Sequence, residues 1–328
     1  MSDLAPLAEG GVAEPLVVHP PDFHVFDKFL VRCKDLPAIN VAVCWPLTDV
    51  ALSGATEAAD EGLIVPVLVG PLEQMEALAR SLNLDISKYR LINAASESEA
   101  ATRSVALCRS GECQALMKGS LHTDELIQAC LDKDLGLRAG RLISHVFLLD
   151  TPAYNRTLLI TDAAINIYPT LVDKVDIVQN CINLAHALGI PEPKVALLSA
   201  VETVSPKILS TLDAASLCKM ADRGQITGGI LDGPLAFDTA VSAQAAKIKG
   251  LVSSVAGEAD ILMVPDVESG NMLAKQLEYL GGAQLAGIVV GSRVPIILTS
   301  RADSAEARLA STAVAVLLHY ASLAAPKA

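Results

Sequence analysis

The sequence predicts an α/β protein in which helices cover both sides of a largely parallel sheet. Short apolar runs alternate with amphipathic helical patterns along most of the 328 residues, as expected for consecutive βαβ units. Hydrophobic residues make up 52% of the chain, yet aromatic residues make up only 3%, so Ala, Leu, Val and Ile must supply the core. This composition suits buried parallel strands better than an aromatic-rich β-sandwich.

The predicted strands and helices begin after an N-terminal segment whose hydrophobic residues show no periodicity. Residues 1–20 contain Gly10, Gly11, Pro15 and Pro20 and are expected to form a loose arm. Short apolar runs predict strands at residues 40–44, 65–69, 91–93, 115–118, 145–149, 158–161, 195–199, 229–231, 261–264, 286–290 and 295–298. Helical patterns lie at residues 53–61, 72–82, 96–110, 123–133, 170–188, 206–221, 240–247, 271–280 and 304–323.

A polar interruption at residues 150–156 predicts a boundary between two domains. If the last helix folds back on the first half, both chain ends belong to domain one. We therefore expect two three-layer α/β/α domains with a cleft between them. Domain one comprises residues 21–155 plus 301–328, and domain two comprises residues 156–300.

Composition and charge exclude several classes of function. The net charge of −12 argues against nucleic acid as a partner, because that binding depends on Lys and Arg. The seven cysteines lack C-x-x-C spacing, and no basic segment leads into an apolar stretch near the N-terminus. These features predict a cytoplasmic protein. The apolar run at residues 313–325 is too short to span a bilayer.

Familiar catalytic motifs are absent from the sequence. No G-x-G-x-x-G, G-x-x-x-x-G-K-[ST], H-E-x-x-H or G-x-S-x-G occurs, which argues against a Walker ATPase, a zincin and an α/β-hydrolase. The His, Cys and carboxylate residues do not fall at zinc spacing, so we expect no metal.

The most informative stretch is residues 259–304, where three apolar runs, at 261–264, 286–290 and 295–298, predict strands of a parallel sheet and are followed by polar residues. In open α/β sheets, ligands bind at the carboxyl ends of strands, so Asp266, Gly270 and Asn271 are candidates for substrate binding. Gly270 and Asn271 are expected to open a helix whose amides would meet an anion. Ser300 and Arg301 follow another strand, and Arg301 offers a bidentate grip on phosphate or carboxylate. The alternative is that the serines cap helices and that Arg301 is a solvated charge.

Further candidates follow strands elsewhere in the chain. Lys118, His122 and Thr123 lie between a strand and a helix, where backbone amides and a lysine would meet a phosphate. The alternative is a plain turn with Thr123 as N-cap. Asp162 and Asn166 follow the strand at residues 158–161. Asp232 stands beside the turn-forming Gly233-Pro234, and Arg293 is a local positive group that suits a small anion.

Seven segments, taken in order, resemble the phosphate acetyltransferase and phosphate butyryltransferase family. They are ALMKGSLHT, LISHVFLLD, LLITDAAINIYPTLVDKVDI, ALGIPEPKVALLSAVETVSPK, MADRGQITGGILDGPLAFDTAVS, GEADILMVPDVESGNML and VPIILTSRADS, between Ala115 and Ser304. The resemblance implies a fold similar to isocitrate and isopropylmalate dehydrogenases, and a homodimer. It implies reversible transfer of a short acyl group between coenzyme A and inorganic phosphate through a ternary complex, without a metal or redox cofactor.

The resemblance also assigns the reacting centre. Ser300 and Arg301 match the family's motif, which implies that Ser300 lies at the reacting centre and that Arg301 stabilises charge in the transition state. Many acetyltransferases of the family carry an Asp seven residues after this Ser, proposed as the base toward the CoA thiol. Ala307 occupies that position here. Glu306 or Asp303 would therefore have to act as the base, unless the CoA thiol needs little help from a base to lose its proton.

Two other functions fit the same observations. The first is an NAD(P)-dependent hydroxy-acid dehydrogenase on the same fold, which would need a cluster of metal-binding acids. The second is a non-catalytic CoA-binding protein, which Ala307 suggests.

Overall fold

The structure, a computed structural model, describes residues 25–299 and 304–324. Its strands are β1 (Ile39–Cys44), β2 (Ile64–Gly70), β3 (Arg90–Asn93), β4 (Ala115–Lys118), β5 (Ser144–Asp150), β6 (Leu158–Thr161), β7 (Lys194–Leu198), β8 (Ile230–Leu235), β9 (Ile261–Met263), β10 (Gln284–Val290) and β11 (Ile296–Ile297). Every strand predicted from the apolar runs is present, within a few residues at its ends.

The helices are α1 (Val25–Cys33), α2 (Asp49–Asp60), α3 (Leu72–Ser81), α4 (Glu97–Ser110), α5 (Thr123–Leu131), α6 (Leu171–Ala187), α7 (Leu209–Asp222), α8 (Phe237–Val241), α9 (Ala243–Ile248), α10 (Val267–Tyr279) and α11 (Ala305–Ala324). The sequence analysis missed α1, which buries Phe26 and Phe29. It also joined α8 and α9 into one helix. The two separate at Ser242, whose hydroxyl accepts a hydrogen bond from the amide of Ala245 and caps α9.

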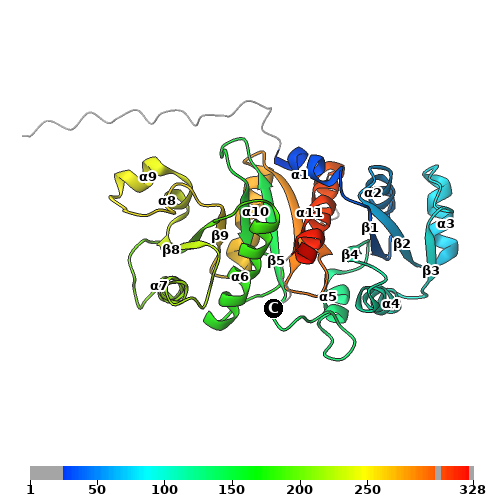
Figure 1. Ribbon diagram of the computed structural model, residues 1–328, viewed down its shortest axis with the longest axis horizontal. Helices are drawn as coiled ribbons and strands as arrows, with labels where there is room; N and C mark the ends of the chain where they lie inside the picture. Colours follow the sequence, from blue (N-terminus) through cyan, green and yellow to red (C-terminus); the bar gives the residue numbers. More distant parts are fainter. Residues whose placement is uncertain (1–24, 300–303, 325–328) are drawn as a thin grey trace, which may run out of the picture.

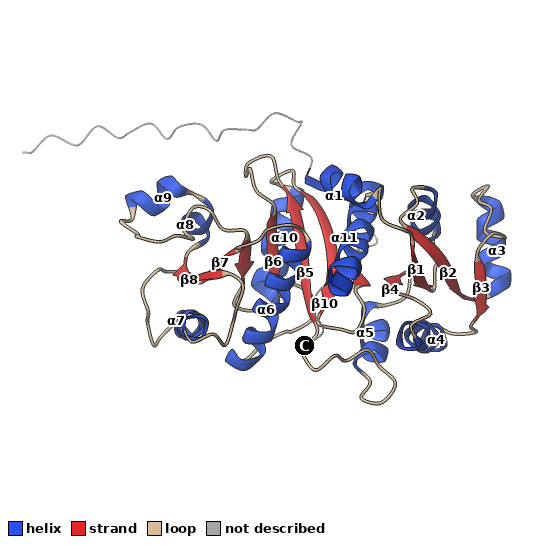
Figure 2. Ribbon diagram, viewed as in Figure 1, coloured by secondary structure: helices blue, strands red, loops and turns tan. Residues whose placement is uncertain are grey.

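All described strands belong to one sheet, in the order β3-β2-β1-β4-β11-β10-β5-β6-β9-β7-β8. The strands β3, β2, β1, β4 and β11 are parallel to one another, and so are β6, β9, β7 and β8. Between these two blocks, β10 is antiparallel to β11, β5 is antiparallel to β10, and β6 is antiparallel to β5. The two parallel blocks therefore run in opposite directions, with β10 and β5 at the centre of the molecule (Figures 1 and 2).

Helices cover both faces of the sheet, as the predicted α/β class requires (Figure 2). Buried side chains of α1, α2, α3, α6, α7 and α11 form one hydrophobic core against one face. Side chains of α4 and α5 form a second core on the other face, and side chains of α8 and α10 form a third. The expected three layers are confirmed, but the expectation that the strand at 286–290 runs parallel to its neighbours is wrong.

The proposed domain boundary falls in the connection between β5 and β6, and the sheet continues across it. The division into residues 21–155 plus 301–328 and 156–300 stays a prediction.

Helix α11 explains the apolar run near the C-terminus. It has 20 residues and is long and apolar enough to cross a membrane by length and composition. However, it packs against α1, α2 and β10, and ten of its residues are buried. The apolar residues of α11 are therefore part of the hydrophobic core. All seven cysteines are free, and all except Cys218 are buried, where Cys acts as a small hydrophobic residue.

Candidate functional site

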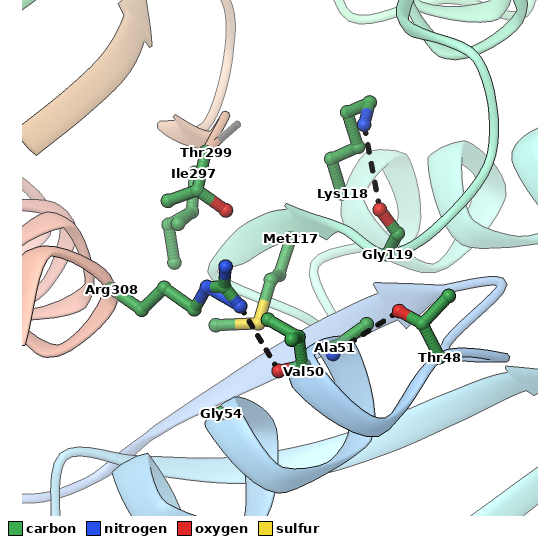
Figure 3. A pocket seen from close by; sticks show the side chains of 10 residues that line it. All are labelled: Thr48, Val50, Ala51, Gly54, Met117, Lys118, Gly119, Ile297, Thr299 and Arg308. Carbon is green, nitrogen blue, oxygen red and sulfur yellow. Dashed lines mark hydrogen bonds between the residues drawn. The ribbon is translucent and has the colours of Figure 1, made fainter. Parts of the chain in front are cut away.

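A cavity of about 180 Å³ lies where β4 and β11 end beside the first turns of α2 (Figure 3). Val50, Ala51, Gly54, Met117 and Ile297 supply its apolar lining. Its polar lining comes from Thr48, Lys118, Gly119, Thr299 and Arg308. Of the residues predicted from the sequence, Lys118 lines this cavity. The cavity therefore combines two cationic side chains with an apolar wall.

Close contact between two loops sets the edge of this cavity. A Cβ atom on Gly119 would lie 2.4 Å from the carbonyl oxygens of Cys44 and Trp45, so only glycine allows the loops after β1 and β4 to approach this closely. The amide of Gly119 donates to the Cys44 carbonyl at 2.9 Å, and the amide of Ser120 donates to the Trp45 carbonyl at 2.9 Å. This contact places Thr48, the N-cap of α2, opposite Lys118.

Two buried cations, Lys118 and Arg308, reach the cavity from different elements. Lys118 ends β4 and is 7% exposed, and its ammonium donates to the Gly119 carbonyl at 3.4 Å. Arg308 is 9% exposed, and its guanidinium donates to the carbonyl of Val50 at 3.1 Å. Positive charge held at low exposure attracts an anion strongly, because water screens it poorly. The arrangement therefore suits an anionic group such as a phosphate.

The sequence analysis missed Arg308, Thr48 and Thr299 as site residues. Arg308 follows Ser300 by eight residues and lies within the predicted helix 304–323. It shares one helix face with Ser311, Thr312 and Ala315, all of which are buried. An arginine at helical spacing from buried residues is the signal that would have found it.

Four other predicted residues, Asp162, Asn166, Gly270 and Asn271, come together after β6. The Asp162 carboxylate accepts hydrogen bonds from the amides of Ala164, Ile165 and Asn166 and from the Asn166 side chain, at 2.5 to 3.2 Å. Burial raises the pKa of Asp162, and these donors oppose the shift. The Asn271 side chain donates to the Ala163 carbonyl at 3.3 Å. Asp162 therefore holds its own loop in shape.

Helix α10 begins earlier than predicted, which changes the role of Gly270. Asp266 is the N-cap, and its carboxylate accepts from the amide of Ser269 at 2.8 Å, while the Ser269 hydroxyl lies 3.4 Å from the Asp266 amide in a capping box. The amide of Gly270 donates to the Asp266 carbonyl inside the helix. The expectation that Gly270 and Asn271 open the helix is wrong, because α10 begins at Val267. Gly270 instead allows α10 to pack closely, because its Cβ would lie 2.7 Å from Val264.

The remaining predicted residues lie apart from the cavity. Asp232 is in β8 at the edge of the sheet and accepts from the amide of Gly233 at 2.8 Å. Arg293 lines a separate cavity of about 580 Å³ with Asn180 and His186. His122, not Thr123, is the N-cap of α5, and His122 is exposed. Ser300 and Arg301 lie outside the described residues, directly after Thr299 in the chain.

Ala307, the residue at the position expected to carry the base toward the CoA thiol, is buried. Ala307 is 4% exposed in the first turn of α11. The neighbouring Glu306 is exposed, and its own backbone amide and the Ser304 hydroxyl hold its pKa below the usual range. A lowered pKa makes Glu306 a weaker proton acceptor. Asp303, the other alternative, lies outside the described residues.

Known proteins of one family match the chain over most of its length. The family model "Phosphate acetyl/butaryl transferase" matches residues 98–316. A phosphate acetyltransferase of Rhizobium meliloti is 54% identical over 89% of this chain and 92% of its own length. A phosphate butyryltransferase of Clostridium beijerinckii is 42% identical over 89% of this chain and 97% of its own.

A solved structure confirms the fold. The crystal structure of a branched-chain phosphotransacylase from Enterococcus faecalis V583 is similar with a TM-score of 0.75 and 31% identity, over 86% of this chain and 99% of that one. Sequence and structure therefore agree, and the chain belongs to the phosphate acetyl/butyryl transferase family.

Proposed function

We propose that this protein transfers a short acyl group reversibly between coenzyme A and inorganic phosphate, and that the cavity at β4, β11 and α2 holds the acyl phosphate. The assignment rests on one observation. In a chain of this family, the cavity is lined by both cationic and apolar side chains. Lys118 and Arg308 provide charge for a phosphoryl group, and the apolar wall provides surface for a short acyl chain.

The reaction needs the two substrates to be held side by side. In the direction of acyl-CoA synthesis, the CoA thiolate attacks the carbonyl carbon of the acyl phosphate and forms the C–S bond. The bond from this carbon to the phosphate oxygen breaks, and phosphate leaves with the electron pair. Alignment of two bound reactants is itself a large contribution to rate. Lys118 and Arg308 would bind the phosphoryl oxygens, which gain charge as the bond breaks.

Ser300 and Arg301 complete the proposed centre. Both follow Thr299, which lines the cavity, and both match the motif through which the sequence resembles the family. We assign Ser300 to the reacting carbonyl and Arg301 to the charge of the transition state. A thiol has a reference pKa of about 8.5, so only about 3% is thiolate at pH 7, and this small fraction is the attacking species.

The other properties proposed here follow from the family and the sequence. We propose a cytoplasmic homodimer that uses CoA and phosphate as substrates and needs no metal or redox cofactor. Exposed apolar side chains at Ile167, Tyr168 and Val172, before and at the start of α6, support an interface between subunits. No observation favours the NAD(P)-dependent dehydrogenase or the non-catalytic CoA-binding protein.

The substitution Lys118→Ala tests this assignment. It is expected to lower kcat/KM for phosphate roughly 10²-fold, as removal of one well-placed stabilising group commonly does. Release of CoA thiol from acetyl-CoA on addition of phosphate provides the assay, and thermal unfolding checks that the variant is folded. Lys88→Ala is the matched control, because Lys88 is exposed and pairs with Asp60 at the surface. A folded Lys118→Ala protein with the kinetics of the control would contradict the assignment.

A further inference from the structure

A second cavity, of about 580 Å³, lies at the opposite end of β11 from the cavity proposed for the acyl phosphate. Pro295, directly before β11, lines the second cavity, whereas Ile297, the last residue of β11, lines the first. Helix α11 is divided in the same way, because Arg308 in its first turn lines the first cavity and Leu318 lines the second. A helix rises by about 15 Å between two such positions. The second cavity is therefore separate from the proposed catalytic centre.

The second cavity carries positive charge in a protein that is negative as a whole. Arg141 and Arg293 line it, and none of the described residues in its lining is acidic. The chain has 37 acidic and 25 basic residues, and its net charge is −12. Asp176 of α6 does not line the cavity, and its carboxylate accepts a hydrogen bond from the amide of Leu142 at 2.9 Å. The local excess of positive charge therefore favours an anionic ligand.

Both arginines keep hydrogen-bond donors for a ligand. Arg293 donates from Nε to the carbonyl of Arg138 at 3.3 Å, which holds the side chain in place, and its terminal nitrogens bond no described residue. Arg141 makes no hydrogen bond or ion pair with the part of the chain that the structure describes. Each guanidinium can bind two oxygens of one phosphate side by side. The pair therefore suits a ligand with two linked phosphates.

Two asparagines of α6 add neutral hydrogen-bonding groups to the lining. Asn180 is 4% exposed, and its amide nitrogen donates to the carbonyl of Leu142 at 2.8 Å and to the hydroxyl of Ser144 at 3.0 Å. These bonds fix its orientation, and its side-chain oxygen accepts no hydrogen bond from a described residue. Gly291 lets the loop after β10 close on Asn180, because a Cβ atom there would lie 2.5 Å from its Nδ2. Asn183 lies one turn later on the same helix face and offers its amide hydrogens.

Apolar side chains complete the lining and leave room for more than a phosphate. Val294 and Pro295 precede β11, and Leu318 and Ala321 belong to the second half of α11. Cavities of roughly 300 to 1,000 Å³, lined by apolar groups and a few placed polar groups, commonly bind small organic ligands. The asparagines can pair with the edge of a nucleobase, and the apolar side chains can cover its ring.

We infer that the second cavity binds a nucleotide, with its phosphates at Arg141 and Arg293 and its base between the two asparagines and the apolar side chains. The inference does not depend on the proposed acyl transfer, because none of these residues lines the first cavity. Coenzyme A also contains a nucleotide, so the experiment has to separate this site from the binding of CoA as a substrate.

Isothermal titration of the full chain with ADP tests the inference. The double variant Arg141→Ala/Arg293→Ala is expected to raise the Kd of ADP at least 10-fold, because charge-assisted hydrogen bonds to its phosphates are lost. Arg80→Ala/Arg109→Ala is the matched control, since it removes the same charge from exposed positions outside the cavity. This control should keep the wild-type Kd.

Two further measurements identify the site and the ligand. Lys118→Ala, in the first cavity, should bind ADP with the wild-type Kd, and Arg141→Ala/Arg293→Ala should keep the wild-type kcat/KM for acetyl-CoA. Inorganic pyrophosphate is expected to bind the wild type at least 10-fold more weakly than ADP, because it cannot use the asparagines or the apolar side chains.

Four results would overturn the inference. The first is no binding of ADP to the wild type, and the second is an equal Kd in the two double variants. The third is loss of ADP binding in Lys118→Ala, or loss of acyl transfer in Arg141→Ala/Arg293→Ala, which would assign the ADP to the CoA site. The fourth is an equal Kd for pyrophosphate and ADP, which would show a site for phosphate groups without recognition of the nucleoside.

Discussion

At the scale of single residues, His145 is an ionisable side chain without a partner in the middle of the sheet. Its ring is fully buried in β5, packs edge-on against Phe147 at 4.4 Å, and neither ring nitrogen has a hydrogen-bond partner. Burial, with a smaller contribution from the nearby Lys275, lowers the pKa of His145 to about 3. The folded protein therefore keeps this histidine neutral in the physiological range.

A depressed pKa in a folded base makes stability depend on pH. The contribution of His145 is fully present above its unfolded pKa of about 6.5 and is lost as the pH falls from there toward 3. From pH 7 to pH 5 the free energy of unfolding should decrease by about 2 kcal/mol through this residue. Urea unfolding of the wild type and His145→Leu at both pH values measures the effect. The decrease should be smaller in the variant by that amount, and equal decreases would refute this account of His145.

At the scale of elements, α10 lies close to the loop after β6 because Gly270 has no side chain. A Cβ atom there would lie 2.7 Å from Val264 and 3.0 Å from the carbonyl oxygen of Asp162. The carbonyl is backbone and cannot rotate away. The position of α10, and with it Asn271, therefore depends on this glycine.

Overpacking at this contact should destabilise the protein. Gly270→Ala is expected to lower the free energy of unfolding by roughly 1–3 kcal/mol, despite the better helix propensity of alanine, because helix and loop must separate. Met272→Ala on the same helix is the control, because Met272 is 65% exposed and its truncation should change stability by less than about 0.5 kcal/mol. Thermal or urea unfolding of both variants provides the comparison. Equal stability of the two would show that the contact is not tight.

At the scale of the whole molecule, alternation of short apolar runs with helical patterns was enough to predict the class and every described strand. Strand direction was not predictable, because a buried strand has the same pattern of apolar residues whether its neighbours are parallel or antiparallel. The reversal at β10 and β5 depends on which strands become neighbours, and β5 and β10 are far apart in the sequence. A local pattern does not contain that information.

The same limit applies to the candidate site. Lys118 was predictable because it stands at the end of a strand. The helical spacing of Arg308 from buried residues could have marked it as a buried cation, but its place in the cavity was not predictable, because it reaches the cavity only once α11 packs beside α2. Asp162 and Asp266 look alike in sequence, as acids after strands, but the structure uses both to satisfy backbone amides. A polar residue at a strand end indicates a position of interest and does not distinguish a ligand-binding group from a cap.

The central claim is that this chain exchanges an acyl group between CoA and phosphate. The most direct test incubates the purified protein with acetyl-CoA and phosphate, without added metal or nicotinamide, and measures free thiol and acyl phosphate in the same sample. We predict equal amounts of both products and, with arsenate in place of phosphate, continued thiol release as the unstable acyl arsenate decomposes. Thiol release that does not depend on phosphate, or no release with acetyl-, propionyl- or butyryl-CoA, would contradict the claim.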